Sequence, residues 1–312
     1  MLTRRHIRVK VMQSIYAFHQ SSSDNLPSYE KFLQKSIEEM YHLYLLQFDI
    51  FIQLKHQAIS YFEILRKKKL ATQEEKNPNL KFINNLVLEA IDASDKLRNE
   101  LEDKKLFNWK KDDEYVRILW DEILKSDLYK EYISTEKQSF EEDKSFIIAI
   151  FKEIIAPNES LYDYIEDQKL TWLDDLPIIN TAILKDIKKL SEEESLKVSK
   201  LFKNQDDQVF SKELLQKTLL NQEEYSKTVQ EKTPNWDKDR IAEIDGILMK
   251  MAICEFLKFP SIPIKVTINE YVEIAKEYST PKSSIFINGI LDKISKEYLA
   301  DKKIKKIGRG LM

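Results

Sequence analysis

The sequence predicts an all-α protein, a helical bundle of two lobes with additional helical insertions, and three observations lead to this class. The 312 residues contain only 4 glycines and 8 prolines, whereas sheet-rich folds need many tight turns that use these residues. Apolar residues recur at helical spacing through most of the chain. Charged residues make up 33%, mostly Lys and Glu, as is typical of solvated helix faces.

The first helix is expected over about residues 3–19. Ile7, Val11, Ile15 and Phe18 follow a spacing of three or four residues and form one apolar stripe. Serines and a proline at residues 21–27 then end the helix. The same segment carries four cations and no acidic residue over residues 1–23, which predicts a basic helix face.

The remaining helices are delimited by Pro, Asn and capping residues. The first group, rich in aromatic residues, is expected at about 29–69, 80–102, 112–134, 140–155 and 159–172. A polar helical segment follows at about 191–234. The last three helices are expected at about 239–257, 267–278 and 280–298. The basic tail, 301–312, is expected to be solvated.

Composition also limits the class of protein. A single cysteine, Cys254, allows no intrachain disulfide and suits a cytoplasmic protein. The apolar run 146–151 is too short to cross a membrane. The four histidines show no metal-ligand spacing, and no glycine-rich phosphate loop or catalytic triad is visible. We therefore expect neither an enzyme nor a metal or cofactor site.

Several residues of the last third have predicted structural roles. Glu255 falls within the apolar stripe of its helix, and a buried carboxylate needs a partner. Lys265, or free N–H groups at the start of the next helix, are the candidates, so that Glu255 would join two helices. Thr267 and Glu270 have the spacing of a capping box. Gly289 is expected to allow close approach of a neighbouring helix.

Four segments together resemble the NusB family. They are Arg240–Phe256 (RIAEIDGILMKMAICEF), Pro263–Lys276 (PIKVTINEYVEIAK), Ser283–Lys293 (SSIFINGILDK), and Arg4–Arg8 followed by Gln13–Tyr16. They occur in the order and at the spacing of the family. The sequence departs from the family's pattern at His6, which interrupts the arginine run, and at Cys254, where an aromatic residue is common.

The resemblance suggests a division of the chain, which is longer than typical family members. Residues 1–23 would be a basic RNA-binding helix, and 24–139 a helical insertion whose role the sequence does not reveal. Residues 140–300 would form the NusB-type domain, with an extra polar segment at about 187–234. Residues 301–312 would be the basic tail.

The resemblance also implies a function, namely transcription antitermination of ribosomal RNA operons. Family members bind single-stranded boxA-like RNA together with the ribosomal protein NusE and tether it to the elongating RNA polymerase. Asp245 matches the position that contacts NusE, whereas its spacing alone indicates only an exposed acid. The residues implied in RNA binding are Arg4, Arg5, Arg8, Lys10, Tyr16, Lys282, Ser283 and Phe286. The basic first helix and the turn before the last helix are expected to form one RNA surface. About four neutralised phosphates would give a slope near −3 for log K against log salt.

Two other functions remain open at this point. The chain could be a helical protein-interaction scaffold whose basic ends are incidental, since helix starts often carry arginine and most aromatic residues are core. It could also resemble the accessory RNA-binding domain of ribosomal RNA methyltransferases, without the catalytic domain. Equal binding of a boxA-type RNA by wild type and by Arg4→Ala/Arg5→Ala/Tyr16→Ala would favour the scaffold.

Overall fold

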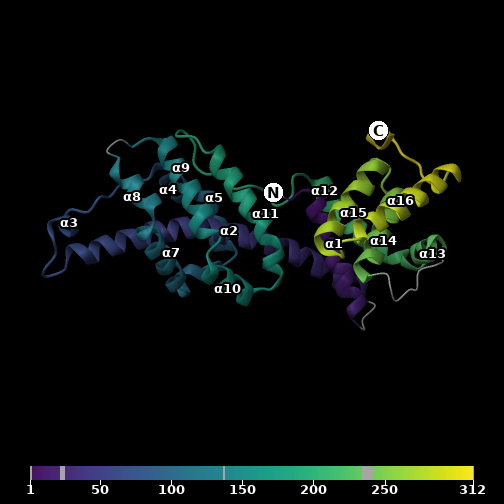
Figure 1. Ribbon diagram of the computed structural model, residues 1–312, viewed down its shortest axis with the longest axis horizontal. Helices are drawn as coiled ribbons and strands as arrows, with labels where there is room; N and C mark the ends of the chain where they lie inside the picture. Colours follow the sequence, from purple (N-terminus) through teal and green to yellow (C-terminus); the bar gives the residue numbers. More distant parts are fainter. Residues whose placement is uncertain (1, 22–24, 136–137, 234–241, 312) are drawn as a thin grey trace. The chain divides into compact units, whose positions relative to one another are not determined.

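The computed structural model describes residues 2–21, 25–135, 138–233 and 242–311 (Figure 1). Within these ranges the chain forms helices and no strand, which confirms the predicted fold class. The chain divides into two compact units. Unit 1 comprises Met1–Ile37 and Leu201–Met312, and unit 2 comprises Glu38–Lys200.

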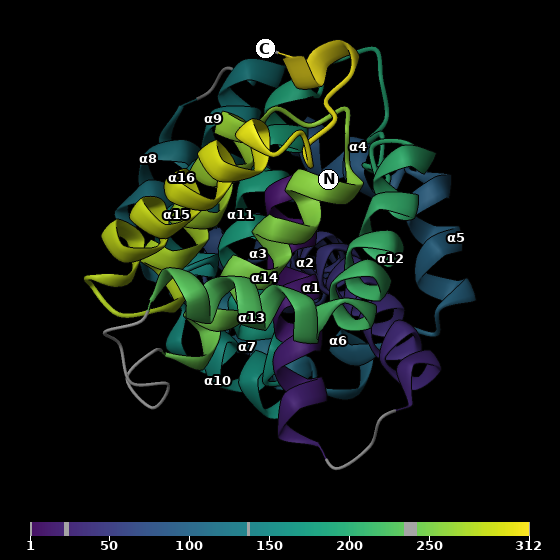
Figure 2. The same cartoon turned by 90° about the vertical axis from the view of Figure 1, so that its right-hand side faces the viewer.

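Unit 1 is built around its first helix. Ile7, Val11 and Ile15 are fully buried, as the apolar stripe predicted. α1 packs against α12, α14 and α15 (Figure 2). The helices of unit 1 are α1 (Arg4–Gln20), the start of α2 (Leu26–Arg66), α12 (Gln205–Leu220), α13 (Gln222–Lys232), α14 (Glu243–Lys258), α15 (Ile264–Tyr278), α16 (Ser283–Ala300) and a 3-10 helix (Gly308–Leu311).

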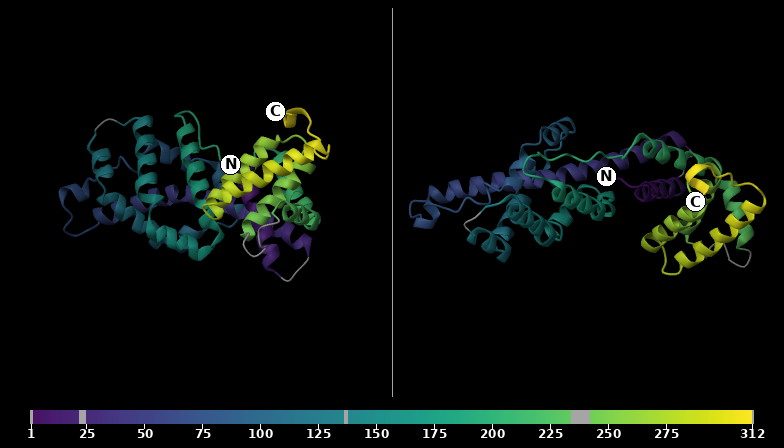
Figure 3. Two further views of the ribbon diagram at one scale, coloured as in Figure 1. Left: turned by 45° about the vertical axis from the view of Figure 1, so that its right-hand side comes forward. Right: turned by 90° about the horizontal axis from the view of Figure 1, so that it is seen from above.

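The closing helices of unit 1 form a hairpin. α15 and α16 lie side by side, joined by a short turn at residues 279–282 (Figure 3). α14 contacts both of them. Residues 239–241, predicted as the first turn of the α14 helix, lie outside the described residues.

Unit 2 takes in the rest of α2 and the helices up to α11. These are α3 (Gln73–Lys76), α4 (Leu86–Asp92), α5 (Asp95–Asp103), α6 (Asn108–Lys111), α7 (Asp113–Lys125), α8 (Asp127–Ser134), α9 (Phe140–Ile150) with a π-helical turn (Phe151–Ile155), α10 (Glu159–Gln168) and α11 (Thr171–Lys189). Aromatic side chains fill its core, with Trp120 fully buried between Phe82 and Tyr129.

Three predicted helices are in fact divided or shortened. The predicted helix 80–102 is two helices because the Ser94 hydroxyl accepts from the Leu97 N–H and starts α5. Ser126 does the same for α8 and divides the predicted helix 112–134. In the predicted segment 191–234, residues 191–204 form no helix. There the backbone around Leu196 bonds instead to Ala90 and Ser94.

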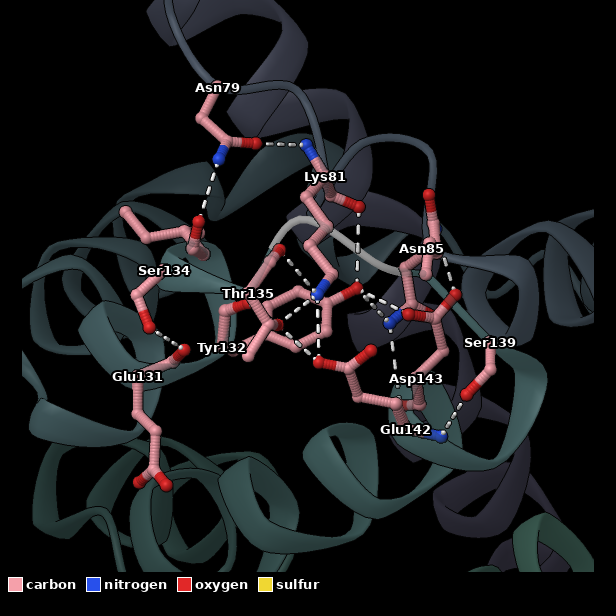
Figure 4. Close-up of polar contacts among 12 residues, drawn as sticks. Asn79, Lys81, Asn85, Glu131, Tyr132, Ser134, Thr135, Ser139, Glu142 and Asp143 are labelled. Carbon is pink, nitrogen blue, oxygen red and sulfur yellow. Dashed lines mark hydrogen bonds and ion pairs between the residues drawn. The ribbon is translucent and has the colours of Figure 1, made fainter.

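A buried polar network joins α4, α8 and α9 of unit 2 (Figure 4). Asp143, fully buried, accepts from the Tyr132 hydroxyl at 2.6 Å, the Leu86 N–H at 2.7 Å and the Gln138 amide at 2.9 Å. Burial and this carboxylate raise the pKa of Tyr132, so its hydroxyl stays protonated. Lys81 lies alongside and contacts Glu142 at 2.8 Å. The network satisfies polar groups that would otherwise be buried without partners.

Candidate nucleic-acid interface

The cationic start of α1 is set by a local cap. The Thr3 hydroxyl accepts from the His6 N–H, and the His6 Nδ1 accepts from the Thr3 N–H at 3.3 Å. Burial, followed by the charge of Arg5, lowers the pKa of His6, so its ring is neutral near pH 7. The cap starts the helix at Arg4 and directs the following arginines towards α12, α14 and α15.

Arg8 is part of a buried ion pair. Its side chain is 2% exposed and binds the fully buried Glu255 through two parallel contacts, Nε–Oε2 at 2.9 Å and Nη2–Oε1 at 2.8 Å. Burial lowers the pKa of the Arg8 guanidinium, but Glu255, together with Tyr271 and Glu270, raises it by more, so the net shift is upward. Burial of Glu255 was predicted correctly, but its partner was not. The partner is Arg8, whereas Lys265 is exposed.

Two hydroxyl groups of α15 complete the shell around Glu255. Thr267 donates to Oε1 at 2.6 Å, and Tyr271 donates to Oε2 at 3.3 Å. Glu255 therefore joins three helices, α14, α1 and α15, rather than two. The carboxylate has a partner at each oxygen, which is the condition for burying a charge in a packed core.

The capping box predicted at Thr267 and Glu270 is wrong. α15 begins one turn earlier, at Ile264, because Pro263 occupies the position before the helix. This places Thr267 inside the helix, buried beside Glu255, and frees Glu270 for other contacts. Glu270 binds Arg5 through two contacts, at 3.0 and 3.1 Å.

The side chains of Arg4 and Arg5 remain partly exposed to solvent. Arg4 lies 2.9 Å from Asp207 and over the ring of Phe210, and its side chain is 39% exposed. The Arg5 side chain is 38% exposed beside Glu270. Lys10, by contrast, is buried. Of the four predicted N-terminal cations, two can therefore reach a polyanion without rearrangement of the helix.

The second predicted surface, the turn before α16, is tied to the start of α14. Asp245 accepts from the hydroxyls of Ser279, at 2.5 Å, and Ser283, at 2.7 Å. Spacing had indicated an exposed acid, but Asp245 is 4% exposed because these serines cover it. Lys282 is exposed and Phe286 is half-buried, and both stand on the turn that Asp245 anchors.

Gly289 does not have the predicted packing role. It is exposed, and a Cβ added there would meet no atom within 4 Å. Its lack of a side chain is thus not required by a neighbouring helix.

The prediction of one RNA surface, formed by the α1 arginines and the α16 turn together, is wrong, because the structure places the two apart along α1. Arg8 binds Glu255 near the end of α14, whereas Gln20 donates to Glu243 at its start, so α1 and α14 run antiparallel. The Asp245–Ser283 contact places the α16 turn at the His19 end of α1. The arginines lie at the opposite end, about 20 Å away along the helix. Tyr16 is 41% exposed and lies one turn before Gln20, in the half of α1 whose end lies near the α16 turn.

Sequence reasoning missed the cluster at the His19 end. The Lys250 amino group lies 3.3 Å from the His19 ring, which in turn lies 3.5 Å from Glu243. Burial lowers the pKa of Lys250 to about 8, an effect that Glu243 only partly opposes. Lys250 follows Glu243 by two helical turns in sequence, but no pattern in the sequence places His19 between them.

The lowered pKa of Lys250 predicts a pH dependence. A lysine that loses its proton more easily when folded binds fewer protons than in the unfolded chain, so stability rises with pH between about 8 and 10. We expect wild type to gain about 1–2 kcal/mol relative to Lys250→Met across this range. Urea unfolding of both proteins at several pH values measures the difference. Parallel curves would contradict the assignment.

Other kinds of site are not found in the described part of the chain. No group of three His, Cys, Asp or Glu side chains gathers there as a metal site would require. None of the helices described has the length and apolar character needed to cross a membrane.

The fold and site together define a helical-bundle protein whose cationic first helix is anchored by acidic residues of later helices. The comparisons give the family. Residues 172–296 match the NusB family model. Proteins called transcription antitermination protein NusB match from Salinibacter ruber (42% identical over 103 residues), Chloroherpeton thalassium (51% over 78) and Thermodesulfovibrio yellowstonii (41% over 100). Residues 172–296 of the chain are therefore a NusB-family domain.

The match covers only part of each protein. The match to the Salinibacter ruber protein covers 33% of this chain and 64% of that protein. The corresponding shares are 25% and 37% for Chloroherpeton thalassium, and 32% and 66% for Thermodesulfovibrio yellowstonii. The chain thus spans less than two thirds of the length of these relatives. No solved structure matches the chain significantly. The matched region runs from α11 into α16, so most of unit 2 lies outside it.

Proposed function

We propose that the chain is a transcription antitermination factor that binds single-stranded boxA-like RNA together with NusE and holds it near the elongating RNA polymerase. The names of the relatives and the motifs of the last three helices support this function. The single observation that carries the RNA-binding part is the exposure of Tyr16 in the half of α1 whose end lies near the turn that bears Lys282 and Phe286. Aromatic rings next to cations are what single-stranded RNA recognition requires.

In this proposal some of the residues contact the RNA directly, and others hold the contacting residues in position. The Tyr16 ring stacks on a base, with Phe286 as a second stacking surface. Lys282, and further along the strand Arg4 and Arg5, neutralise phosphates. Asp245 and Ser283 hold the turn in place, and the surface around them docks NusE. Arg8 and Lys10 act through the fold, because burial leaves little of either side chain for RNA.

Burial also changes the expected salt dependence. Three exposed cations of the predicted set, Arg4, Arg5 and Lys282, can contact about three phosphates. Single-stranded binding then gives a slope of about −2 for log K against log salt, and a steeper one if further cations take part. The slope near −3 expected from the sequence assumed four N-terminal contacts.

Replacing Tyr16 with alanine tests the proposal. We expect affinity for a boxA-type RNA, measured with NusE present, to fall about tenfold, because stacking of one base contributes about 1–3 kcal/mol. Tyr162→Ala is the matched control, since Tyr162 of unit 2 is similarly exposed, at 46% against 41% for Tyr16. Fluorescence anisotropy with labelled RNA provides the measurement.

One observation favours a second function, that of a protein-interaction scaffold. Arg4, Arg5 and Arg8 each have a carboxylate partner within unit 1, so these charges are used in folding. A scaffold predicts equal, weak RNA binding by wild type, Tyr16→Ala and Tyr162→Ala. That result would overturn the RNA-binding proposal.

A further inference from the structure

The C-terminal tail is folded against unit 1, not solvated as its composition had indicated. The Lys306 amino group donates to the carbonyl oxygens of Glu255, at 3.2 Å, and Phe259, at 3.0 Å. These carbonyls lie at the end of α14, where each also accepts a backbone N–H, from Phe259 and Ile262 respectively, so that the Lys306 cation adds a second donor at the negative end of the helix. The Ile307 N–H donates to the Pro260 carbonyl at 3.1 Å. The tail therefore packs against the end of α14 and the connection between α14 and α15 as a bound segment.

Two glycines allow this path. Gly308 has a φ of +53°, a conformation that other residues rarely adopt. Gly310 is buried, and a Cβ there would lie 1.9 Å from the Pro260 carbonyl oxygen. Any side chain at position 310 must push the tail away from Pro260. The glycines on either side of Arg309 thus fix where its side chain is presented.

Arg309 lines the same cleft as the arginines of α1. The cleft has a volume of about 680 Å³. Its charged lining groups are Arg4, Arg5, Arg8, Arg309 and Glu270. Three of these arginines are paired with Asp207, Glu270 and Glu255. Arg309 is exposed, and within the described ranges it forms no ion pair. It is the cation of this cleft whose charge is not neutralised by the fold.

From this arrangement we infer that Arg309, presented by the folded tail, binds a backbone phosphate of the RNA in the cleft beside Arg4 and Arg5. The inference rests on the proposed function and adds a residue and a segment to it. Apolar walls at Ile262, Pro263 and Val266 exclude water from one side of the cleft, which strengthens a contact between guanidinium and phosphate. A strand that runs from the Tyr16 end of α1 would reach this cleft at the other end.

Replacing Arg309 with glutamine tests the inference in the full chain. With a short labelled boxA-type RNA and NusE, we expect affinity to fall about tenfold, the lower end for loss of a hydrogen bond to a charged group. The slope of log K against log salt should become less steep by about 0.7, the value for one phosphate of a single strand.

Two further variants separate the position of the tail from its charge. Lys305→Gln removes an exposed cation of the same tail that does not line the cleft, and it should bind RNA like wild type. Gly310→Ala keeps Arg309 but displaces the tail, and it should bind like Arg309→Gln.

The outcomes distinguish this inference from the proposed function. Salt-dependent RNA binding by wild type with equal affinity of Arg309→Gln overturns the role of Arg309 and leaves the proposed function standing. Equal losses in Arg309→Gln and Lys305→Gln would also overturn it, because they indicate a nonspecific charge effect. No binding by wild type with NusE present overturns both.

Discussion

Replacing Arg8 with methionine is expected to lower the free energy of unfolding by about 3–5 kcal/mol, because it leaves the Glu255 carboxylate buried without its ionic partner. The carboxylate is fully buried, and the two hydroxyls that remain, from Thr267 and Tyr271, cannot neutralise its charge. Glu255→Gln should destabilise for the same reason, since it leaves the Arg8 guanidinium buried. Urea unfolding followed by far-UV circular dichroism measures both effects.

Two comparisons sharpen this test. Arg4→Met removes an arginine of the same helix whose pair with Asp207 is partly exposed, and it should lose less than about 1 kcal/mol. The double variant Arg8→Met/Glu255→Met should be more stable than either single change at these positions, since no unpaired charge remains. If Arg8→Met instead weakens RNA binding while stability is unchanged, the residue contacts RNA directly, as the family resemblance implies.

Asp143→Ala is expected to destabilise unit 2 by about 3 kcal/mol. The change leaves the Tyr132 hydroxyl and the Leu86 N–H without their carboxylate acceptor in a buried site, whereas the exposed Gln138 amide still donates to the Asn84 carbonyl. Each unsatisfied buried group contributes about 1–3 kcal/mol, and partial relaxation reduces the sum. Urea unfolding followed by tryptophan fluorescence suits this test, because three of the four tryptophans, Trp109, Trp120 and Trp172, lie in unit 2.

The control for Asp143 is another acid of the same helix. Glu141 stands in the first turn of α9, and its side chain is 78% exposed. Among the described residues, its ion pair is with Lys144. Glu141→Ala should leave the unfolding midpoint unchanged. Equal midpoints for Asp143→Ala and wild type would mean that the polar network of Figure 4 does not hold α4, α8 and α9 together.

Local pattern accounts for most of what the sequence predicted correctly. The helical class, the span of α1 and its buried stripe follow from residue spacing, because each is decided within one or two helical turns. The divisions at Ser94 and Ser126 were missed, although serine is a good cap. Serine also occurs inside helices, and only the packing of α5 and α8 shows that these two act as caps.

Partner choice could not be predicted in the same way. The spacing of α14 placed Glu255 in the core and required a partner, but the partner, Arg8, comes from a helix 247 residues away in sequence. The same uncertainty affected Asp245, which two serines of the α16 turn cover. Because of Pro263, α15 begins one turn earlier than predicted. Thr267 and Glu270 are therefore not capping residues. Thr267 is a partner of a buried charge, and Glu270 is a partner of a surface charge.

The sequence by itself determined the helical class, the buried stripe of α1 and the family motifs, since these depend on residues that are neighbours along the chain. Tertiary structure alone decided which cations remain available to a polyanion. Arg8 and Lys10 are enclosed by the bundle, whereas Arg309 is brought to the same cleft by a tail that two glycines allow to fold back. The physical reason is that the availability of a charge depends on burial and on the nearest opposite charge, and both are set by residues distant in sequence.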